Sequence, residues 1–156
     1  MDLKELSQKI RDVFPEAVSE EQANAIVVKK ESLLPVAKFL KESDLQFATC
    51  HCISGVDRKD KSLEVVYFLY SFKQKFMLVL KTVLPRENPE VQTVSGLWKS
   101  ANWLERETFD LYGIKFLNHP DPRRILNPDE WTDWPLRKDF DRPDFYKLPQ
   151  VQGLKG

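Results

Sequence analysis

Proline is concentrated at the C-terminal end of this chain of 156 residues. Six of the ten prolines fall within residues 113–156, at Pro120, Pro122, Pro128, Pro135, Pro143 and Pro149. Because proline lacks a backbone N–H and fixes φ, this segment can form neither a long helix nor a central strand. It is nevertheless too rich in large hydrophobic residues for a disordered linker. We therefore expect a domain over residues 1–112 and an extended C-terminal strap over residues 113–156, which packs on its own domain, on a partner, or on both.

Residues 1–94 have the pattern of a compact α+β fold. Asp2 and Glu5 form a capping-box pattern at the start of the first expected helix. The expected helices span 3–14 and 33–40, and the expected strands span 25–28, 46–53, 63–72 and 75–84. The last two strands flank a short polar turn and predict an antiparallel hairpin. With a final helix, the order αβαβββα predicts a small, mostly antiparallel sheet with helices on one face.

The final helix is predicted between Ser95, a suitable N-cap, and Gly113, a suitable C-terminal stop. Its hydrophobic residues share one arc at 100° per residue, and Glu105 falls on the flank of that arc. A carboxylate in an apolar surrounding is costly unless it is paired. We expect Glu105 to pair with Arg123 or Arg124 as the strap folds back.

The other side of this helix carries Trp103, Arg106 and Asp110. Arg106 and Asp110 are spaced i, i+4, which suits an ion pair on a helix surface. Since the helix then has hydrophobic or charged groups on two sides, we expect something to cover its second face. Aromatic, Arg and acidic residues crowded together in this region favour recognition of another protein.

Three strings in the C-terminal third carry a resemblance to a known family. They are E-R-E-x-F-D-L-Y-G-I-x-F at residues 105–116, H-P-D-x-R-R-I-L at 119–126 and W-P-L-R-K-D-F at 134–140. Together they resemble the signature of the 30-kDa subunit family of respiratory complex I, the NADH-quinone oxidoreductase. The plastid and cyanobacterial NDH complex, F420H2 dehydrogenases and membrane-bound hydrogenases have related subunits. Trp134 stands where many NADH-linked members have His, so the electron donor (NADH, ferredoxin or F420H2) and the acceptor (quinone or protons) stay open.

The resemblance implies a non-catalytic structural subunit in the hydrophilic arm of a membrane-associated oxidoreductase. Its implied partners are the 49-kDa-type large subunit and the subunit that carries the terminal iron–sulfur cluster. Clusters and quinone would then belong to those neighbours, and this chain would hold no cofactor. It would lie on the cytoplasmic side of the membrane, or on the matrix or stromal side in an organelle. The candidate interface or motif residues are Trp103, Glu105, Arg106, Asp110, His119, Arg123, Arg124, Trp134, Arg137 and Lys138. Arg137 and Lys138 are expected to pair with partner carboxylates.

Composition argues against several other functions. The formal net charge is zero, with 31% charged residues of mixed sign, so no general basic field attracts nucleic acid. Only five glycines are present, and no glycine-rich phosphate-binding loop occurs. The longest uncharged apolar run, residues 65–72, is far shorter than the ~20 residues of a membrane span. Membrane contact is therefore expected only through other subunits.

A small metal-binding or redox protein that uses Cys50, Cys52 and His119 is the alternative. On a regular strand Cys50 and Cys52 point to one face and His51 to the other, so these three residues would not converge on one ion. Zinc and iron–sulfur sites also require more ligands than the chain supplies there. We expect two small buried thiols on a strand, and we expect His119 to orient the chain through hydrogen bonds rather than act as an acid or base.

Overall fold

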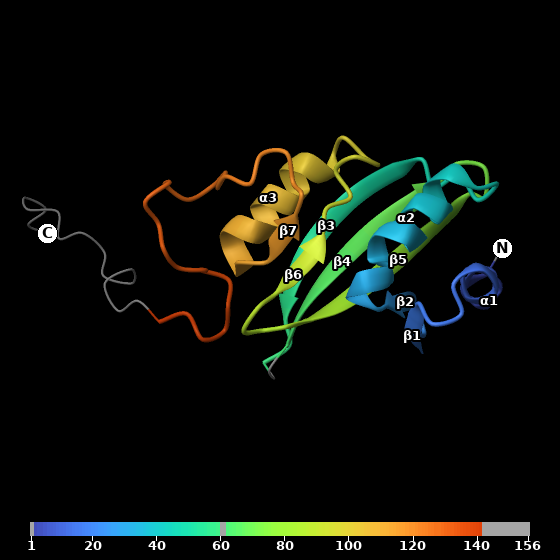
Figure 1. Cartoon of the computed structure of the whole chain (residues 1–156), viewed down its shortest axis with the longest axis horizontal. Coiled ribbons are helices and arrows are strands. Elements are labelled where there is room, and N and C mark those ends of the chain that lie inside the picture. Colours follow the sequence, from blue (N-terminus) through green and yellow to red (C-terminus); the bar gives the residue numbers. More distant parts are fainter. Residues whose placement is uncertain (1, 60–61, 142–156) are drawn as a thin grey trace, which may run out of the picture.

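The computed structural model describes residues 2–59 and 62–141. Its main sheet has the strand order β1 (Val18–Gln22), β2 (Ala25–Val28), β5 (Phe76–Pro85), β4 (Ser62–Ser71), β3 (Thr49–Asp57). Neighbouring strands are antiparallel except β2 and β5, which are parallel. The helices α1 (Leu3–Val13), α2 (Leu33–Glu42) and α3 (Ala101–Tyr112) complete the domain (Figure 1). The expected α+β class, with a mostly antiparallel sheet and helices on one face, is confirmed.

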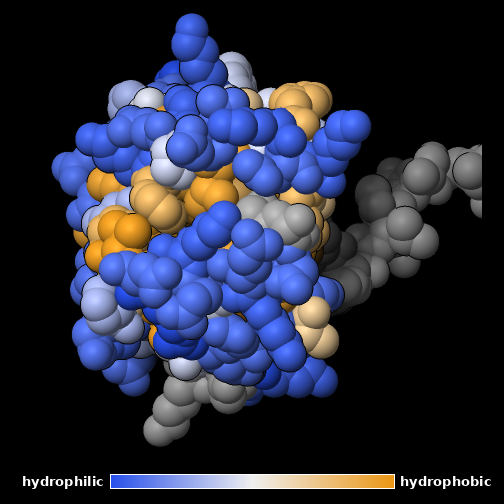
Figure 2. Space-filling model, turned by 90° about the vertical axis from the view of Figure 1, so that its right-hand side faces the viewer, coloured by the Kyte–Doolittle hydropathy of each residue, from blue (hydrophilic) through white to orange (hydrophobic). Residues whose placement is uncertain are grey.

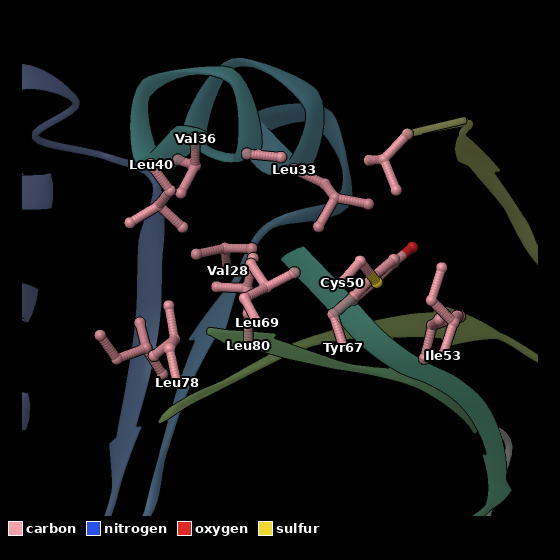
Figure 3. Close-up of a cluster of buried hydrophobic side chains, with 14 of the residues drawn as sticks. Val28, Leu33, Val36, Leu40, Cys50, Ile53, Tyr67, Leu69, Leu78 and Leu80 are labelled. Atoms are coloured by element: carbon pink, nitrogen blue, oxygen red, sulfur yellow. The ribbon is translucent and has the colours of Figure 1, made fainter. Parts of the chain in front are cut away.

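The core lies between this sheet and its helices. Alternate residues of β4 and β5 are fully buried on the covered face, among them Tyr67, Leu69, Leu78 and Leu80. Figure 3 shows side chains of α2, including Leu40, pointing down toward them. At about 25 cal/mol per Å² of apolar area removed from water, such burial supplies the main stabilisation of a domain of this size.

The helices begin and end where local chemistry allows. The Asp2 side chain accepts a hydrogen bond from the Glu5 N–H at 2.7 Å, which confirms the predicted cap of α1. Pro35 lies in the first turn of α2, where its missing N–H costs nothing. None of the helices in residues 2–59 and 62–141 has the length and apolar character to cross a membrane.

The start of α3 differs from the prediction. The helix begins at Ala101 rather than just after Ser95, and residues 94–100 form turns. These turns are held by long-range bonds: the Trp98 indole N–H donates to the Phe47 carbonyl at 3.0 Å, and the Lys41 ammonium donates to the Leu97 carbonyl. Tertiary contacts therefore override the local helical pattern.

Cys50 and Cys52 lie on opposite faces of β3, so the expectation that they share a face is wrong. The register with β4 shifts between them: Cys50 is opposite Leu69 and Cys52 is opposite Phe68. This irregularity is a β-bulge at His51, which adds one residue to one strand and reverses the alternation. Cys50 is buried as expected, Cys52 is only partly buried because it faces the other side of the sheet, and His51 is exposed.

The strap begins inside the domain. Its residues Lys115–Leu117 form strand β7, which pairs in parallel with β6 (Glu90–Gln92) as a second, two-stranded sheet. Ile114 and Phe116 are buried in the main core cluster. The described part then passes beside α3 and returns toward the end of β3 (Figure 1). The prolines Pro143 and Pro149 lie outside the described residues.

The two sides of the sheet differ in exposure. Large hydrophobic residues on the uncovered side keep part of their surface in solvent, including Val56 at 38%, Met77 at 43% and Val83 at 38%. Figure 2 shows the end of the molecule that carries α1, where hydrophilic residues surround a short band of hydrophobic ones. The strongest concentration of buried charge lies at neither place, but between α3 and the strap.

Candidate functional site: the contact between helix α3 and the strap

Asp110 of α3 is the centre of this contact. Its carboxylate has no exposed surface and accepts hydrogen bonds from the backbone N–H groups of Ile125, Leu126 and Asn127 at 3.0, 2.7 and 2.8 Å. The Asn127 amide and the Arg124 guanidinium donate to its other oxygen at 2.9 and 2.7 Å. These donors hold the pKa of Asp110 far below its usual value, although burial alone would raise it. The carboxylate thereby fixes the strap backbone to α3.

Arg124 is held between this carboxylate and aromatic rings. Its guanidinium lies 4.4 Å from the centroid of the Trp134 ring and 5.8 Å from that of Phe109. It also donates to the Asp110 and Asp133 carbonyls. Planar guanidinium groups combine ion pairing with stacking in this way, which Lys cannot do. Arg124 and Trp134 thus join two distant parts of the strap.

Trp134 lies against the end of α3. Gly113 ends that helix in the left-handed region, at φ +69°. A Cβ on Gly113 would stand 2.5 Å from an atom of the Trp134 ring. Gly113 is required for two reasons: only glycine readily adopts this left-handed conformation, and a side chain would block the close approach of the Trp134 indole.

A second buried carboxylate, Asp57 at the end of β3, holds the far part of the strap. It accepts hydrogen bonds from the backbone N–H groups of Lys138 at 2.8 Å and Lys59 at 2.9 Å, and it pairs with Arg86. Arg86 also contacts Asp139 at 3.1 Å. The pKa of Asp57 is lowered because these donors outweigh its burial. Nearby, the Arg137 side chain donates to the Tyr112 carbonyl at 2.6 Å.

Glu105 is a third buried carboxylate, in a different environment. Its side chain is 0% exposed and accepts hydrogen bonds from the Val94 N–H at 2.7 Å and from the Thr93 hydroxyl. Within residues 2–59 and 62–141 no Lys or Arg lies within ion-pair distance, and the nearest basic atom is His119 Nε2 at 3.6 Å. Burial therefore raises the pKa of Glu105 to about 7.

His119 is fixed by backbone groups on both ring nitrogens. Nδ1 accepts a hydrogen bond from the Asp121 N–H at 3.0 Å, and Nε2 lies 3.1 Å from the Asn102 carbonyl. These partners fit a neutral ring protonated on Nε2. The ring thereby joins the beginning of the turn after β7 to α3.

Arg106 binds the strap and does not pair with Asp110. It contacts Asp121 at 3.2 Å and donates to the carbonyls of Arg123 and Arg124 at 3.0 and 2.9 Å. Its guanidinium also lies 5.2 Å from the ring centroid of Trp103, whose side chain is 61% exposed. The Arg123 guanidinium pairs with Asp121 on the surface.

Two predicted pairings are therefore wrong. Glu105 pairs with neither Arg123 nor Arg124, and Arg106 does not pair with Asp110. Asp110 and Arg106 bind atoms of the strap instead of each other, because several strap groups converge on each of them, whereas Glu105 accepts hydrogen bonds from Thr93 and Val94, just before the helix. The strap covers the part of the second face that carries Arg106 and Asp110, whereas Trp103 stays 61% exposed.

Sequence reasoning did not identify Asp57, Arg86, Thr93 or Asn127. Asp57 and its partner Lys138 are 81 residues apart. No local spacing links such residues, so only the fold brings them together.

A pocket of about 340 Å³ opens beside Glu105. Its walls are largely apolar, from Phe109, Phe116, Leu117 and Pro122, and its polar groups include Glu105, Arg106 and His119. Exposure rises from Glu105, at 0%, to Leu117, at 38%, which places Glu105 at the inner end and Leu117 at the rim.

The cysteines do not form a centre with His119. Among the residues that the structure describes, no group of three or more His, Cys, Asp or Glu side chains could hold a metal ion. Burial raises the pKa of the Cys50 thiol to about 12, so this group stays protonated at neutral pH. A reactive or ligating thiolate at this position is therefore disfavoured.

A mostly antiparallel α+β domain, with its last helix fastened to an extended strap by buried carboxylates, is the class that fold and site define. Residues 26–146 match the family described as the respiratory-chain NADH dehydrogenase 30-kDa subunit, and the chain belongs to that family. A subunit of the NADH-quinone oxidoreductase of Geobacter sulfurreducens is 46% identical over 118 residues, which cover 74% of this chain and 72% of the relative. A subunit of the F(420)H(2) dehydrogenase of Methanosarcina mazei is 39% identical over 148 residues, covering 90% and 93%.

Solved structures show the same fold. A chain of the archaeal membrane-bound sulfane sulfur reductase superposes with a TM-score of 0.76 at 24% identity, covering 95% of this chain and 93% of that chain. A trypsin-resistant fragment of Nqo5 superposes with a TM-score of 0.60 at 28% identity, covering 78% and 99%.

Proposed function

We propose that this chain is a non-catalytic structural subunit of the hydrophilic arm of a membrane-associated quinone oxidoreductase that takes electrons from NAD(P)H, ferredoxin or F420H2. In this proposal α3 and the strap pack against the 49-kDa-type large subunit, near the quinone-reducing module and the iron–sulfur subunit. Iron–sulfur clusters and quinone belong to those neighbours. The complex attaches the chain to the cytoplasmic face of the membrane, or to the matrix or stromal face in an organelle.

One observation carries the proposal: backbone groups of the strap are hydrogen-bonded to buried carboxylates while large apolar side chains near them stay exposed. Trp103 and Leu126 are each 61% exposed and Leu136 is 49% exposed. A protein that fixes a proline-rich segment through buried carboxylates, yet leaves such residues in water, presents a preformed apolar surface. Preorganisation lowers the ordering cost of binding, and Trp is a frequent anchor at protein interfaces.

The polar groups of this region support a structural role over catalysis. Asp110 and Arg106 of α3 are engaged with strap atoms, Arg124 of the strap donates to Asp110, and His119 is engaged on both nitrogens. Relatives with 46% and 39% identity bear names of subunits of an NADH-quinone oxidoreductase and of an F(420)H(2) dehydrogenase. A stand-alone metal or redox protein based on Cys50, Cys52 and His119 has no comparable support, because the bulge in β3 separates the two thiols.

The test is recovery of the tagged chain from detergent-solubilised membranes of its native host, with mass spectrometry of the co-purifying proteins. The proposal expects a 49-kDa-type subunit together with iron–sulfur and membrane subunits. Recovery of the chain alone would contradict it. The accompanying donor module would also identify the electron source.

A charge reversal localises the contact. Lys138 is exposed, and only its backbone N–H is used by Asp57. Lys138→Glu should lower recovery of the large subunit several-fold while the melting temperature of the isolated chain stays within about 2 °C, because surface substitutions change stability by about 0.5 kcal/mol or less. Lys4→Glu, on the exposed side of α1, is the matched control. Equal recovery of the large subunit with both variants would show that Lys138 does not lie at the interface.

A further inference from the structure

An open apolar pocket of about 520 Å³ lies where β3 begins, and none of the described residues that line it belongs to the strap. Its apolar walls come from Phe72, just after β4, and from Leu97 and Trp98, just before α3. The Phe72 side chain is 64% exposed, more than any other large hydrophobic side chain that the structure describes. Apolar surface of this kind often marks a site of protein interaction.

The walls of the pocket are held in place from within the chain. The Trp98 indole N–H donates to the Phe47 carbonyl at 3.0 Å, and the Ser100 hydroxyl donates to the Cys50 carbonyl at 2.8 Å. These bonds fix the segment 97–100 to the chain around the start of β3. A partner would meet preformed walls, which lowers the ordering cost of binding.

Phe72 belongs to a row of three aromatic rings. Its ring meets the Tyr70 ring edge-on with centroids 5.0 Å apart, and the Tyr70 ring meets the His51 ring in the same way at 5.7 Å. His51 lines the pocket as well. Edge-to-face packing restrains these rings, so Phe72 is positioned by its neighbours and still exposed.

The charged residues of the pocket are cations. Lys41 and Lys99 line it, whereas none of its described lining residues is Asp or Glu. The Lys41 ammonium donates to a neutral group, the Leu97 carbonyl, and neither lysine forms an ion pair within residues 2–59 and 62–141. The acidic residues that follow Lys41 in sequence, Glu42 and Asp44, pair with other lysines.

These charges select an occupant that carries a carboxylate. Lys41 is partly exposed, so a partner that covers the pocket removes water from its side chain. A neutral occupant leaves this loss uncompensated, and a cationic occupant adds repulsion. A carboxylate offsets the loss with an ion pair, and the exposed Lys99 is open to the same group from solvent.

A polypeptide fits the pocket better than a membrane surface does. Binding to anionic lipid typically takes clusters of about 4–8 basic residues, whereas this pocket has two lysines on a chain of zero net charge. The apolar walls require an apolar side chain, and the lysines require a carboxylate close to it. A short acidic and hydrophobic segment of a protein supplies both.

We propose that this pocket binds an acidic, hydrophobic segment of another subunit, with an apolar side chain against Phe72 and an Asp or Glu paired with Lys99 and Lys41. The inference rests on the proposed function, because the partner is a subunit of the same complex. It adds a second interface, before the N-terminal end of α3, in which the strap takes no part.

Zero-length crosslinking tests the carboxylate. A carbodiimide joins a lysine to a carboxylate that touches it, and it is applied to the complex recovered with the tagged chain. The expected product links Lys99 or Lys41 to an Asp or Glu of another subunit, within a few residues of a large apolar residue. Lys99→Arg keeps the charge but forms no such amide, so it should lose the Lys99 product at unchanged recovery. Absence of any such product from an intact complex overturns the inference.

Charge reversal tests the ion pair. Lys99→Glu should lower recovery of the crosslinked subunit about tenfold, because like charges would then face each other. The melting temperature of the isolated chain should stay within about 2 °C, since a carboxylate near the N-terminal end of a helix is itself favourable. Lys4→Glu, on the exposed side of α1, is the matched control. Equal recovery with the two variants overturns the inference.

Substitution of Phe72 tests the apolar contact. Phe72→Ala should lower recovery of the same subunit about fivefold, whereas Phe72→Tyr keeps the ring and should stay near wild type. Val13→Ala, at a residue 51% exposed on α1, is the control for loss of an exposed apolar side chain. Recovery with Phe72→Ala equal to that with Val13→Ala overturns the inference.

The remaining outcomes separate the inference from the proposed function. Suppose that the isolated chain sediments with phosphatidylserine vesicles, that Lys99→Glu abolishes this, and that no carboxylate crosslink forms. The pocket then binds lipid and the inference is overturned, although the complex survives. Failure of the wild-type chain to recover any complex overturns the proposed function, and the inference falls with it.

Discussion

Asp110 and Glu105 lie little more than one helical turn apart on α3 and behave in opposite ways because their donors differ. Asp110 accepts five side-chain and backbone hydrogen bonds from the strap, one of them from a cation, so its ionised form is stabilised. Glu105 accepts one backbone and one hydroxyl hydrogen bond, which do not offset its burial. The number and charge of the donors, more than depth, decide which carboxyl is ionised at neutral pH.

Asp110→Asn should be severely destabilising. The amide would keep one acceptor oxygen but would direct an NH2 group at backbone donors and at Arg124, which leaves a buried cation unpaired. Breaking such a pair costs about 3–5 kcal/mol. Urea denaturation would measure this loss, and amide hydrogen exchange at residues 125–127 should accelerate. Asp44→Asn, at a fully exposed carboxylate, is the control; similar stability of the two variants would contradict the central role of Asp110.

Glu105→Gln should change the dependence of stability on pH. The folded pKa of Glu105, about 7, lies above its ordinary value of 4.5. Its contribution is therefore fully present below about pH 4.5 and is lost as pH rises through 7, at about 1.4 kcal/mol per pKa unit or about 3 kcal/mol in all. A Gln can accept from Val94 and donate to Thr93, so the variant should equal wild type near pH 5 and exceed it near pH 8.

Thermal unfolding at several pH values would measure this difference. Glu107→Gln, on the exposed side of the same helix, should leave the pH profile of wild type unchanged. A Glu105→Gln variant with the same slope as wild type between pH 5 and 8 would show that Glu105 titrates normally. Asp57 and Asp110 have lowered pKa values, so their effect on stability has the opposite dependence on pH. Their stabilisation of the folded state is present above about pH 4 and is lost on further acidification.

At the scale of elements, the end of α3 depends on a glycine. Gly113→Ala would place a Cβ in a left-handed backbone conformation, which costs about 1–2 kcal/mol, and would also displace the Trp134 ring. The variant should be destabilised by at least this amount, with altered tryptophan fluorescence in its folded state. Gly96→Ala is a matched control, because a Cβ there meets nothing within 4 Å. Equal fluorescence and stability of the two variants would contradict the contact between Trp134 and the helix end.

Elements with strong periodicity were predictable, and elements fixed by distant contacts were not. α1, α2, β2 and the β4–β5 hairpin follow from hydrophobic spacing and turn residues. The strands β1, β6 and β7 have five residues or fewer and little alternation, so no pattern identifies them. The bulge at His51 has no local signal either, and it reversed the expected facing of Cys52.

At the scale of the whole molecule, the domain and its strap should be a single cooperative unit. Removal of residues 119–156 would strip Asp110 of all its donors from the strap, Asp57 of Lys138, and Glu105 of His119. We expect the truncated chain to be unfolded or loosely packed, with poor dispersion in its amide NMR spectrum. A well-dispersed spectrum and a cooperative transition near that of the full chain would show that residues 1–118 are independently stable.

The sequence identified the residues of the α3–strap contact better than it identified their binding partners. The motif strings identified most residues of the α3–strap contact, including Glu105, Asp110 and Arg124, and the helical pattern indicated that the second face of the helix is covered. The partners were wrong because backbone groups of irregular segments, which no side-chain spacing reveals, bind these residues: N–H groups of residues 125–127 bind Asp110, carbonyls of Arg123 and Arg124 bind Arg106, and the Val94 N–H binds Glu105. Asp57 and Arg86 escaped notice because their sequence surroundings are ordinary and their partners lie far along the chain.

The bond between Asp57 and Lys138 has a consequence for the order of events during protein synthesis. The carboxylate leaves the ribosome some 81 residues before the N–H group that it accepts. While the strap is still being made, β3, β4 and β5 can pair, but Asp57 and Asp110 must remain hydrated or find temporary donors. Residues 124–138 therefore complete these contacts only after the strands can have paired, and a chain that lacked them would expose the Asp57 and Asp110 carboxylates without their strap donors.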